Sequence, residues 1–63
     1  MLVKVSYVKR RFFQGYLLHS ASGDRLYQSS DVFKVKEVID VNGYDVIECP
    51  INTLNVFFPI KNH

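Results

Sequence analysis

Residues 30–47 read SDVFKVKEVIDVNGYDVI, and this stretch decides between two folds. β-Branched side chains make up five of the ten residues 32–41, which favours a strand over 32–40. The Asn42-Gly43 pair that follows is typical of the turn in a β-hairpin. The stretch therefore predicts a long strand, a tight turn and a return strand.

A helix is the competing interpretation of the same residues. Ser30 can cap a helix, and Val32, Val35 and Ile39 would share one of its faces. We prefer the strand, because the β-branched content and the turn signal both favour it.

The register of the predicted hairpin depends on its charges. A two-residue turn would place like charges directly opposite each other, which is destabilising. A three-residue loop, Val41-Asn42-Gly43, pairs Asp40 with Tyr44 and Lys36 with Glu48 instead. Each cross-strand pair contributes only about 0.2–1 kcal/mol, but all of them favour the same register. We therefore predict the three-residue loop.

The N-terminal half predicts three further strands. Residues 2–8 alternate between apolar and polar side chains, as in a half-buried strand. Residues 12–19 carry apolar groups on both faces and indicate a more central strand, in which Gly15 predicts a bulge or bend. Residues 20–23 suit a type I turn with a left-handed Gly, and residues 24–28 form the return strand.

The C-terminal segment predicts a turn and a last strand. Pro50 ends the central hairpin, and residues 51–55 are long enough for one 3₁₀ turn. Residues 56–60 predict a final short strand. Pro59 lacks the N–H that a ladder needs, so this strand is expected at an edge of the sheet or at a barrel seam.

The predicted fold class is all-β, in a single domain that spans residues 1–63. This order of strands, hairpin, 3₁₀ turn and closing strand resembles SH3-like small barrels. The resemblance implies such a barrel, or a strongly bent antiparallel sheet, of five or six short strands. It is architectural only, because no family motif matches residue by residue and no functional residue carries over.

Composition limits the setting of this domain. A chain of 63 residues buries a thin core, and Cys49, its only cysteine, cannot form an intrachain disulfide. The chain contains no apolar run of membrane-helix length, and its start lacks a signal-peptide pattern. We expect an intracellular, cytoplasmic protein without membrane contact. Its many Phe, Tyr, Ile, Asn and Lys codons suggest an AT-rich microbial or viral source.

Residues for catalysis or ligand binding are not grouped at any recognisable spacing. His19 is expected to be an ordinary strand residue, because no Cys or acidic residue lies nearby at ligand spacing. The three glycines are isolated, so they form no phosphate-binding loop. We expect no catalytic, metal or cofactor site and no small-molecule substrate, and therefore a non-enzymatic protein.

Binding to nucleic acid or nucleoprotein is the preferred functional prediction. Formal charge is +4 over residues 1–30 and −2 over residues 31–63. Cations can neutralise phosphates, and aromatic faces can stack on unpaired bases. The predicted basic-aromatic face contains Lys9, Arg10, Arg11, Phe12, Tyr16 and Arg25. The competing interpretation is a solvated loop tip beside aromatic residues of the core.

A protein-interaction module is the alternative function. The apolar content, 48%, is large for so small an interior, so some apolar side chains should lie at a partner or homodimer interface. An edge strand can also accept a partner's strand. The predicted interface residues are Val56, Phe57 and Phe58. A small inhibitor of a host protein, viral in origin, belongs to this alternative.

Overall fold

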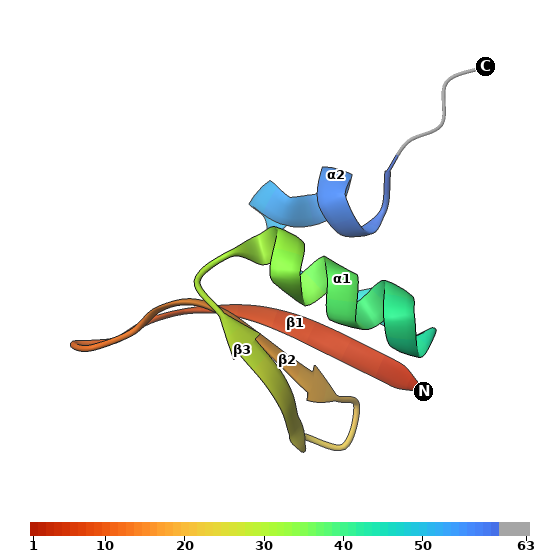
Figure 1. Cartoon of the computed structure of the whole chain (residues 1–63), viewed down its shortest axis with the longest axis horizontal. Coiled ribbons are helices and arrows are strands. Elements are labelled where there is room, and N and C mark those ends of the chain that lie inside the picture. The colour runs from red at the N-terminus through yellow and green to blue at the C-terminus, as the bar shows by residue number, and fades with distance from the viewer. Residues whose placement is uncertain (60–63) are drawn as a thin grey trace.

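The computed structural model describes residues 1–59, which contain four strands and three helical segments. The strands are β1 (Leu2–Lys9), β2 (Gln14–Ser20), β3 (Arg25–Ser29) and β4 (Asp45–Glu48). The helical segments are α1 (Val32–Asn42), the 3₁₀ turn η1 (Ile51–Thr53) and α2 (Leu54–Phe57). Figure 1 shows α1 and α2 on one side of the strands.

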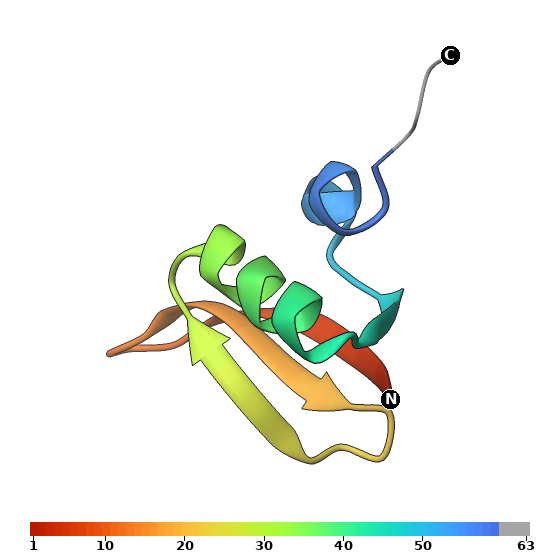
Figure 2. The ribbon, with the colours of Figure 1, turned by 45° about the vertical axis from the view of Figure 1, so that its right-hand side comes forward.

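The four strands form one mixed sheet in the order β3-β2-β1-β4. Neighbours are antiparallel except β1 and β4, which run parallel. The chain leaves the sheet at β3, crosses one face as α1 and returns at the opposite edge as β4 (Figure 2). A parallel connection of this kind needs a crossover segment, and α1 supplies it.

The predicted all-β class is confirmed only in its coarser form, because residues 1–59 are mostly β but also contain the helices α1 and α2. Within residues 1–59 the sheet has four strands rather than five or six. It keeps two separate edges, β3 and β4, so it is not a closed SH3-like barrel. The antiparallel alternative is also wrong, because β4 pairs parallel to β1.

Five apolar side chains form the core between the sheet and α1. Each is at most 5% exposed: Val3, Val5, Leu18, Val35 and Ile39. Because side chains alternate along a strand, the residues between them point to the face that α1 does not cover. We call it the helix-free face, and it carries Lys4, Ser6, Val8, Leu17, His19 and Gln28.

The predicted strand over 32–40 is wrong, because α1 occupies these residues. Asp31 caps the helix, and its Oδ1 accepts a hydrogen bond from the Phe33 N–H at 2.9 Å. Val35 and Ile39 lie one helical turn apart and are both buried against the sheet. Burial of this face outweighs the weak strand preference of β-branched residues.

The Asn42-Gly43 pair ends this helix and does not form a hairpin turn. Gly43 adopts φ 66°, in the left-handed region. Its N–H donates to the Asp40 carbonyl at 3.3 Å, and the Tyr44 N–H donates to the Ile39 carbonyl at 3.1 Å. The predicted loop Val41-Asn42-Gly43 is therefore wrong, because a left-handed Gly suits a helix end as well as a hairpin.

The charge pairs expected from that hairpin are replaced by others. Lys36 Nζ lies 3.1 Å from an Asp40 carboxylate oxygen, one helical turn away. Glu48 Oε2 lies 3.7 Å from Lys4 Nζ of the neighbouring strand β1. Exposed pairs of this type contribute about 0.2–1 kcal/mol, so neither determines the fold.

The three N-terminal strands and the turn at residues 20–23 form as predicted, except that β2 begins at Gln14 and not at residue 12. β1 and β2 pair from Val3–Ser20 to Lys9–Gln14. The next turn is closed by the Gly23 N–H, which donates to the Ser20 carbonyl at 2.9 Å, and Gly23 adopts φ 102°. The predicted return strand is β3.

Gly15 does not form the predicted bulge, since it pairs with Val8 in a regular part of the ladder. A Cβ at this position would lie 2.6 Å from the Ser29 carbonyl oxygen and 2.7 Å from the Ser30 Cα. Glycine is required because the backbone between β3 and α1 approaches this point closely.

The C-terminal segment is helical where the structure describes it. η1 confirms the 3₁₀ turn predicted within 51–55. α2 replaces the strand predicted over 56–60, of which Ile60 lies outside the described residues. The reason is that Phe57 packs against the core from a helical turn. Neither α1 nor α2 has the length and apolar character needed to span a membrane.

Candidate nucleic-acid interface

The β1–β2 turn forms a basic tip, residues 9–12, that extends beyond the rest of the sheet (Figure 1). The Arg10 N–H donates to the Phe13 carbonyl at 2.7 Å and closes the turn. Phe12, the last residue of the basic tip, is 92% exposed. The Arg11 Cζ lies 5.3 Å from the centre of the Phe12 ring. This cation–π contact holds a positive charge beside an accessible aromatic face.

A shallow hollow of about 140 Å³ lies on the helix-free face, next to the basic tip. Two arginines from different hairpins line it, Arg10 from the β1–β2 turn and Arg25 from the start of β3. The other lining residues are Val8, Phe13, Leu17 and Gln28. The hollow thus combines guanidinium groups with an apolar surface, which suits a ligand that is both anionic and aromatic.

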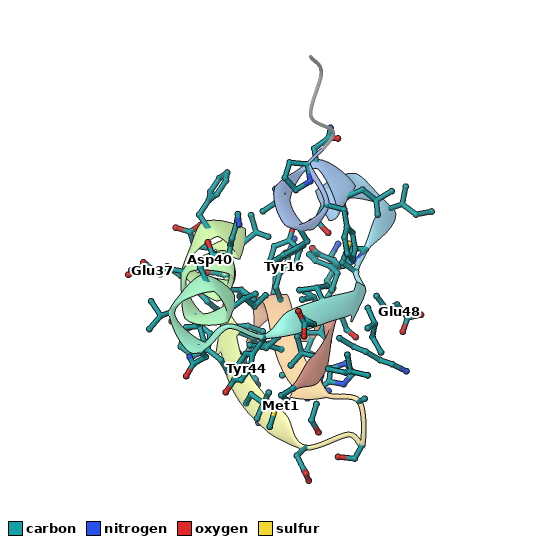
Figure 3. The ribbon with its side chains drawn as sticks, turned by 90° about the vertical axis from the view of Figure 1, so that its right-hand side faces the viewer. Met1, Tyr16, Glu37, Asp40, Tyr44 and Glu48 are labelled. Atoms are coloured by element: carbon teal, nitrogen blue, oxygen red, sulfur yellow. The ribbon has the colours of Figure 1, made fainter. Side chains whose placement is uncertain are left out.

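The structure brings the predicted residues Arg10 and Arg25 together and separates Tyr16 from them. Tyr16 points to the helix-covered side of the sheet, as Figure 3 shows, and packs against the core. Its ring meets that of Tyr7 edge to face, with centroids 5.4 Å apart. Tyr16 is therefore on the opposite face from the hollow, whereas Lys9, Arg11 and Phe12 are exposed in the basic tip.

The hollow also includes residues that sequence reasoning did not assign to the site. Val8 and Leu17 point to the helix-free face, and strand alternation in β1 and β2 could have indicated both. Phe13 lies directly after the basic tip, where its half-buried ring lines the hollow. Gln28 could be assigned only from the register between β2 and β3.

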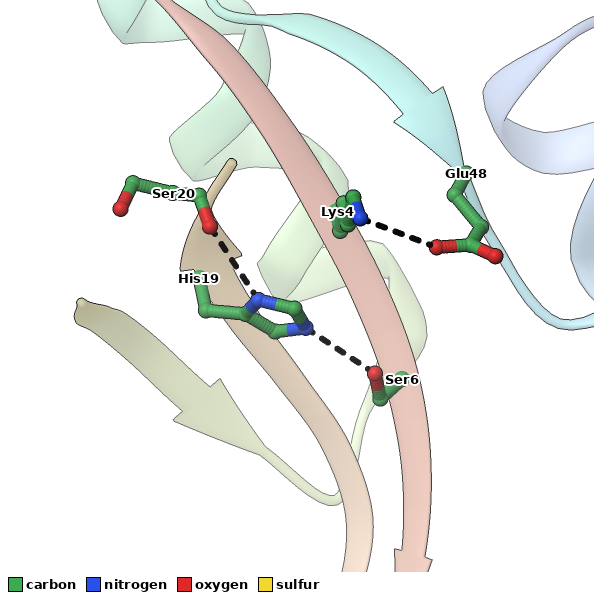
Figure 4. A network of polar contacts seen from close by, with 5 residues as sticks. All are labelled: Lys4, Ser6, His19, Ser20 and Glu48. Atoms are coloured by element: carbon green, nitrogen blue, oxygen red, sulfur yellow. Dashed lines mark hydrogen bonds and ion pairs between the residues drawn. The ribbon is translucent and has the colours of Figure 1, made fainter. Parts of the chain in front are cut away.

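A second polar group lies farther along the helix-free face (Figure 4). His19 Nδ1 lies 3.3 Å from the Ser20 carbonyl, which can only accept, so Nδ1 carries the proton. Nε2 and the Ser6 hydroxyl form a hydrogen bond at 3.0 Å. Ser6 and His19 do not line the hollow beside the basic tip. They anchor two strands to each other, as expected of an ordinary strand histidine.

The predicted protein-interface residues are only partly accessible. Val56 and Phe57 are half-buried, and Phe57 packs against the core. Phe58 is 42% exposed. Larger apolar exposure occurs on α1, where Phe33 is 67% and Val41 78% exposed. Sequence reasoning missed this surface because it placed these residues in a strand and its turn.

Across residues 1–59, no three His, Cys, Asp or Glu side chains are grouped so that they could hold a metal ion. No family model, curated protein or solved structure matches the chain.

Proposed function

We propose that this chain is a non-enzymatic binding module for nucleic acid, and that it prefers single-stranded segments. The observation that carries the proposal is the hollow that Arg10 and Arg25 line together with apolar side chains. Guanidinium groups bind phosphate oxygens through charge-assisted hydrogen bonds. An apolar surface between them can support the face of an unpaired base.

The basic tip adds a second contact for the same ligand. Phe12 offers an exposed ring for stacking on a base, while Lys9 and Arg11 supply charge for the backbone on either side. Bases of a duplex are already stacked and are not available to such a ring. The combination therefore favours a single strand over a duplex.

The setting of the proposed function is intracellular and cytoplasmic. Cys49 is a free, half-buried thiol, and a reducing compartment keeps such groups reduced. Binding to a protein through Val56, Phe57 and Phe58 is less well supported, because Phe57 already packs against the core.

Fluorescence anisotropy with a labelled oligothymidylate, and with a duplex of equal length, tests the proposal. Binding should weaken as salt increases, because each neutralised phosphate of a single strand contributes about −0.7 to the slope of log K against log salt. Arg10→Ala and Arg25→Ala should each reduce that slope by about 0.7. Lys36→Ala is the matched control, since it removes one positive charge from α1 on the other side of the sheet.

Two results would contradict the proposal. One is the absence of any salt-sensitive binding to single strand or duplex. The other is an equal loss of binding in Arg10→Ala, Arg25→Ala and Lys36→Ala, which would indicate attraction by net charge without a defined site. Tighter binding to the duplex would refute the preference for single strands.

A further inference from the structure

The outer edge of β3 is open to another strand. Within residues 1–59, β3 is a terminal strand of the sheet and pairs only with β2. Exposed edges are usually protected by charged side chains or proline. In β3 the first residue, Arg25, is charged, and residues 26–29 contain neither a charged residue nor proline. The edge can therefore accept backbone hydrogen bonds from a further strand.

The direction of the free backbone groups follows from the ladder between β2 and β3. The Ser20 N–H donates towards β3, to the Asp24 carbonyl at 2.8 Å. Backbone hydrogen bonding alternates between the two sides of a strand. The backbone N–H and C=O groups of Leu18 and Tyr16 therefore also point towards β3, where these residues pair with Tyr27 and Ser29. Gln28 lies between Tyr27 and Ser29, so its N–H and C=O point away from the sheet.

A groove of about 310 Å³ runs beside this edge, between β3 and α1. Its lining combines apolar side chains with both signs of charge: Tyr27, Lys34, Glu37, Val38, Val41 and Asn42. Lys34 and Glu37 take part in neither of the ion pairs formed within residues 1–59. Figure 3 shows Glu37 on the side of α1 that faces away from α2.

We propose that the β3 edge and this groove form an interface with a second copy of the chain. The two β3 strands pair antiparallel about a two-fold axis at Gln28, perpendicular to the sheet. Such an interface brings the same surface of both copies together, so a surface that carries both charge signs can be complementary to itself. The two sheets then continue as one, and their helices lie side by side.

The position of α1 along β3 brings Lys34 and Glu37 of different copies together in the proposed dimer. Val38 is the middle of the groove residues of α1, and Tyr27 lines the same groove, so we take these two residues as level with each other. α1 runs back along the sheet, and one strand residue advances about 3.3 Å against about 1.5 Å for a helical residue. Gln28 is therefore level with Lys36. A two-fold axis there places Lys34 of one copy beside the partner's Glu37, and the reverse contact is equivalent.

This inference does not depend on the proposed function, although it affects the same sheet. A two-fold axis perpendicular to the sheet leaves both helix-free faces on one side of the dimer. Both arginine-lined hollows would then face the same ligand. Failure of nucleic-acid binding would leave the dimer proposal intact, and the reverse is equally true.

Sedimentation equilibrium of the full chain, from micromolar to millimolar concentration, tests the interface. The mass should rise towards twice the 7.3 kDa of one chain. Lys34→Glu or Glu37→Lys alone places like charges together at two symmetric contacts and should raise the dissociation constant about tenfold. The double exchange restores opposite charges and should recover the original dissociation constant. Asp45→Lys, on β4 at the other edge, is the matched control and should leave it unchanged.

A second variant examines the strand pairing itself. Gln28→Pro removes the outward N–H and should abolish the dimer, with far-UV circular dichroism to confirm that the monomer is folded. A monomeric mass at every concentration would overturn the proposal and leave the groove to another occupant, such as an extended peptide. A dimer that survives both single charge exchanges, or that the double exchange does not restore, would also overturn it.

Discussion

Gly15→Ala provides a sharp test of how the sheet and α1 fit together. The new Cβ would lie 2.6 Å from the Ser29 carbonyl oxygen and 2.9 Å from the Phe13 ring. Phe13 can rotate, but Ser29 is held in β3 opposite Tyr16. Its Oγ also accepts from the Asp31 N–H at 3.1 Å, next to the helix cap. The methyl group therefore meets backbone that cannot move without disturbing both β3 and α1.

The expected loss of stability follows from the distance that the Ser29 carbonyl oxygen must move. Moving the Ser29 oxygen from 2.6 Å to an ordinary contact of 3.4 Å requires a shift of about 0.8 Å. Overpacking of this kind typically costs about 1–3 kcal/mol. A domain of this length has a total stability of only about 3–9 kcal/mol. The expected fall in Tm is about 4–8 °C for each kcal/mol lost.

Thermal and urea unfolding followed by far-UV circular dichroism measure this loss. Gly43→Ala is the matched control: a Cβ there meets no atom within 4 Å, but φ is 66°. It should lose only about 1 kcal/mol through backbone strain. A Gly15→Ala protein with unchanged Tm would refute the close approach of backbone at Gly15. It would also remove the explanation for glycine as the second residue of β2.

Three further outcomes follow from the same contacts. Asp31→Ala removes the cap of α1 and should lower the free energy of unfolding by about 1 kcal/mol in urea titrations, whereas Ser30→Ala should have little effect. Leu18→Ala empties a fully buried site and should cost about 2–5 kcal/mol, a large share of the total stability, so the Tm measured by circular dichroism should fall strongly. Phe12→Ala removes a 92% exposed ring, so Tm should stay constant while oligothymidylate affinity, measured by anisotropy, falls by about 1–3 kcal/mol. Unchanged stability of Asp31→Ala would contradict its role as the helix cap, and unchanged stability of Leu18→Ala would contradict its burial. Unchanged oligothymidylate affinity of Phe12→Ala would contradict stacking on its ring.

The N-terminal strands and the turn at residues 20–23 could be predicted because their signals are local. Alternation along β1 and the positive φ needed at Gly23 depend on neighbouring residues only. The same local reasoning failed for residues 32–43, where each signal fits two structures. Burial of Val35 and Ile39 against Val3, Val5 and Leu18 determines that the segment is helical. Those contacts join residues far apart in the chain, and periodicity alone did not rank them above the β-branched content.

The candidate site divides in the same way. The basic tip was recognisable from consecutive residues, Lys9-Arg10-Arg11-Phe12. Arg25 was included through its charge, but only the pairing of β2 with β3 places it beside Arg10. Tyr16 was included through its closeness in sequence, and strand alternation takes it to the opposite face. Charge and aromatic content thus indicated the kind of surface, while the register of the sheet determined its members.

The most direct test of nucleic-acid binding by the helix-free face is an NMR titration of the isotopically labelled chain with oligothymidylate. The chemical shifts of backbone amides should change around the hollow and the basic tip, above all at Val8, Phe12, Leu17, Arg25 and Gln28. The chemical shifts of amides on the exposed side of α1, such as those of Phe33 and Glu37, should not change. Changes confined to α1 or α2, or no change at saturating oligonucleotide, would contradict the assignment of the helix-free face as a nucleic-acid interface.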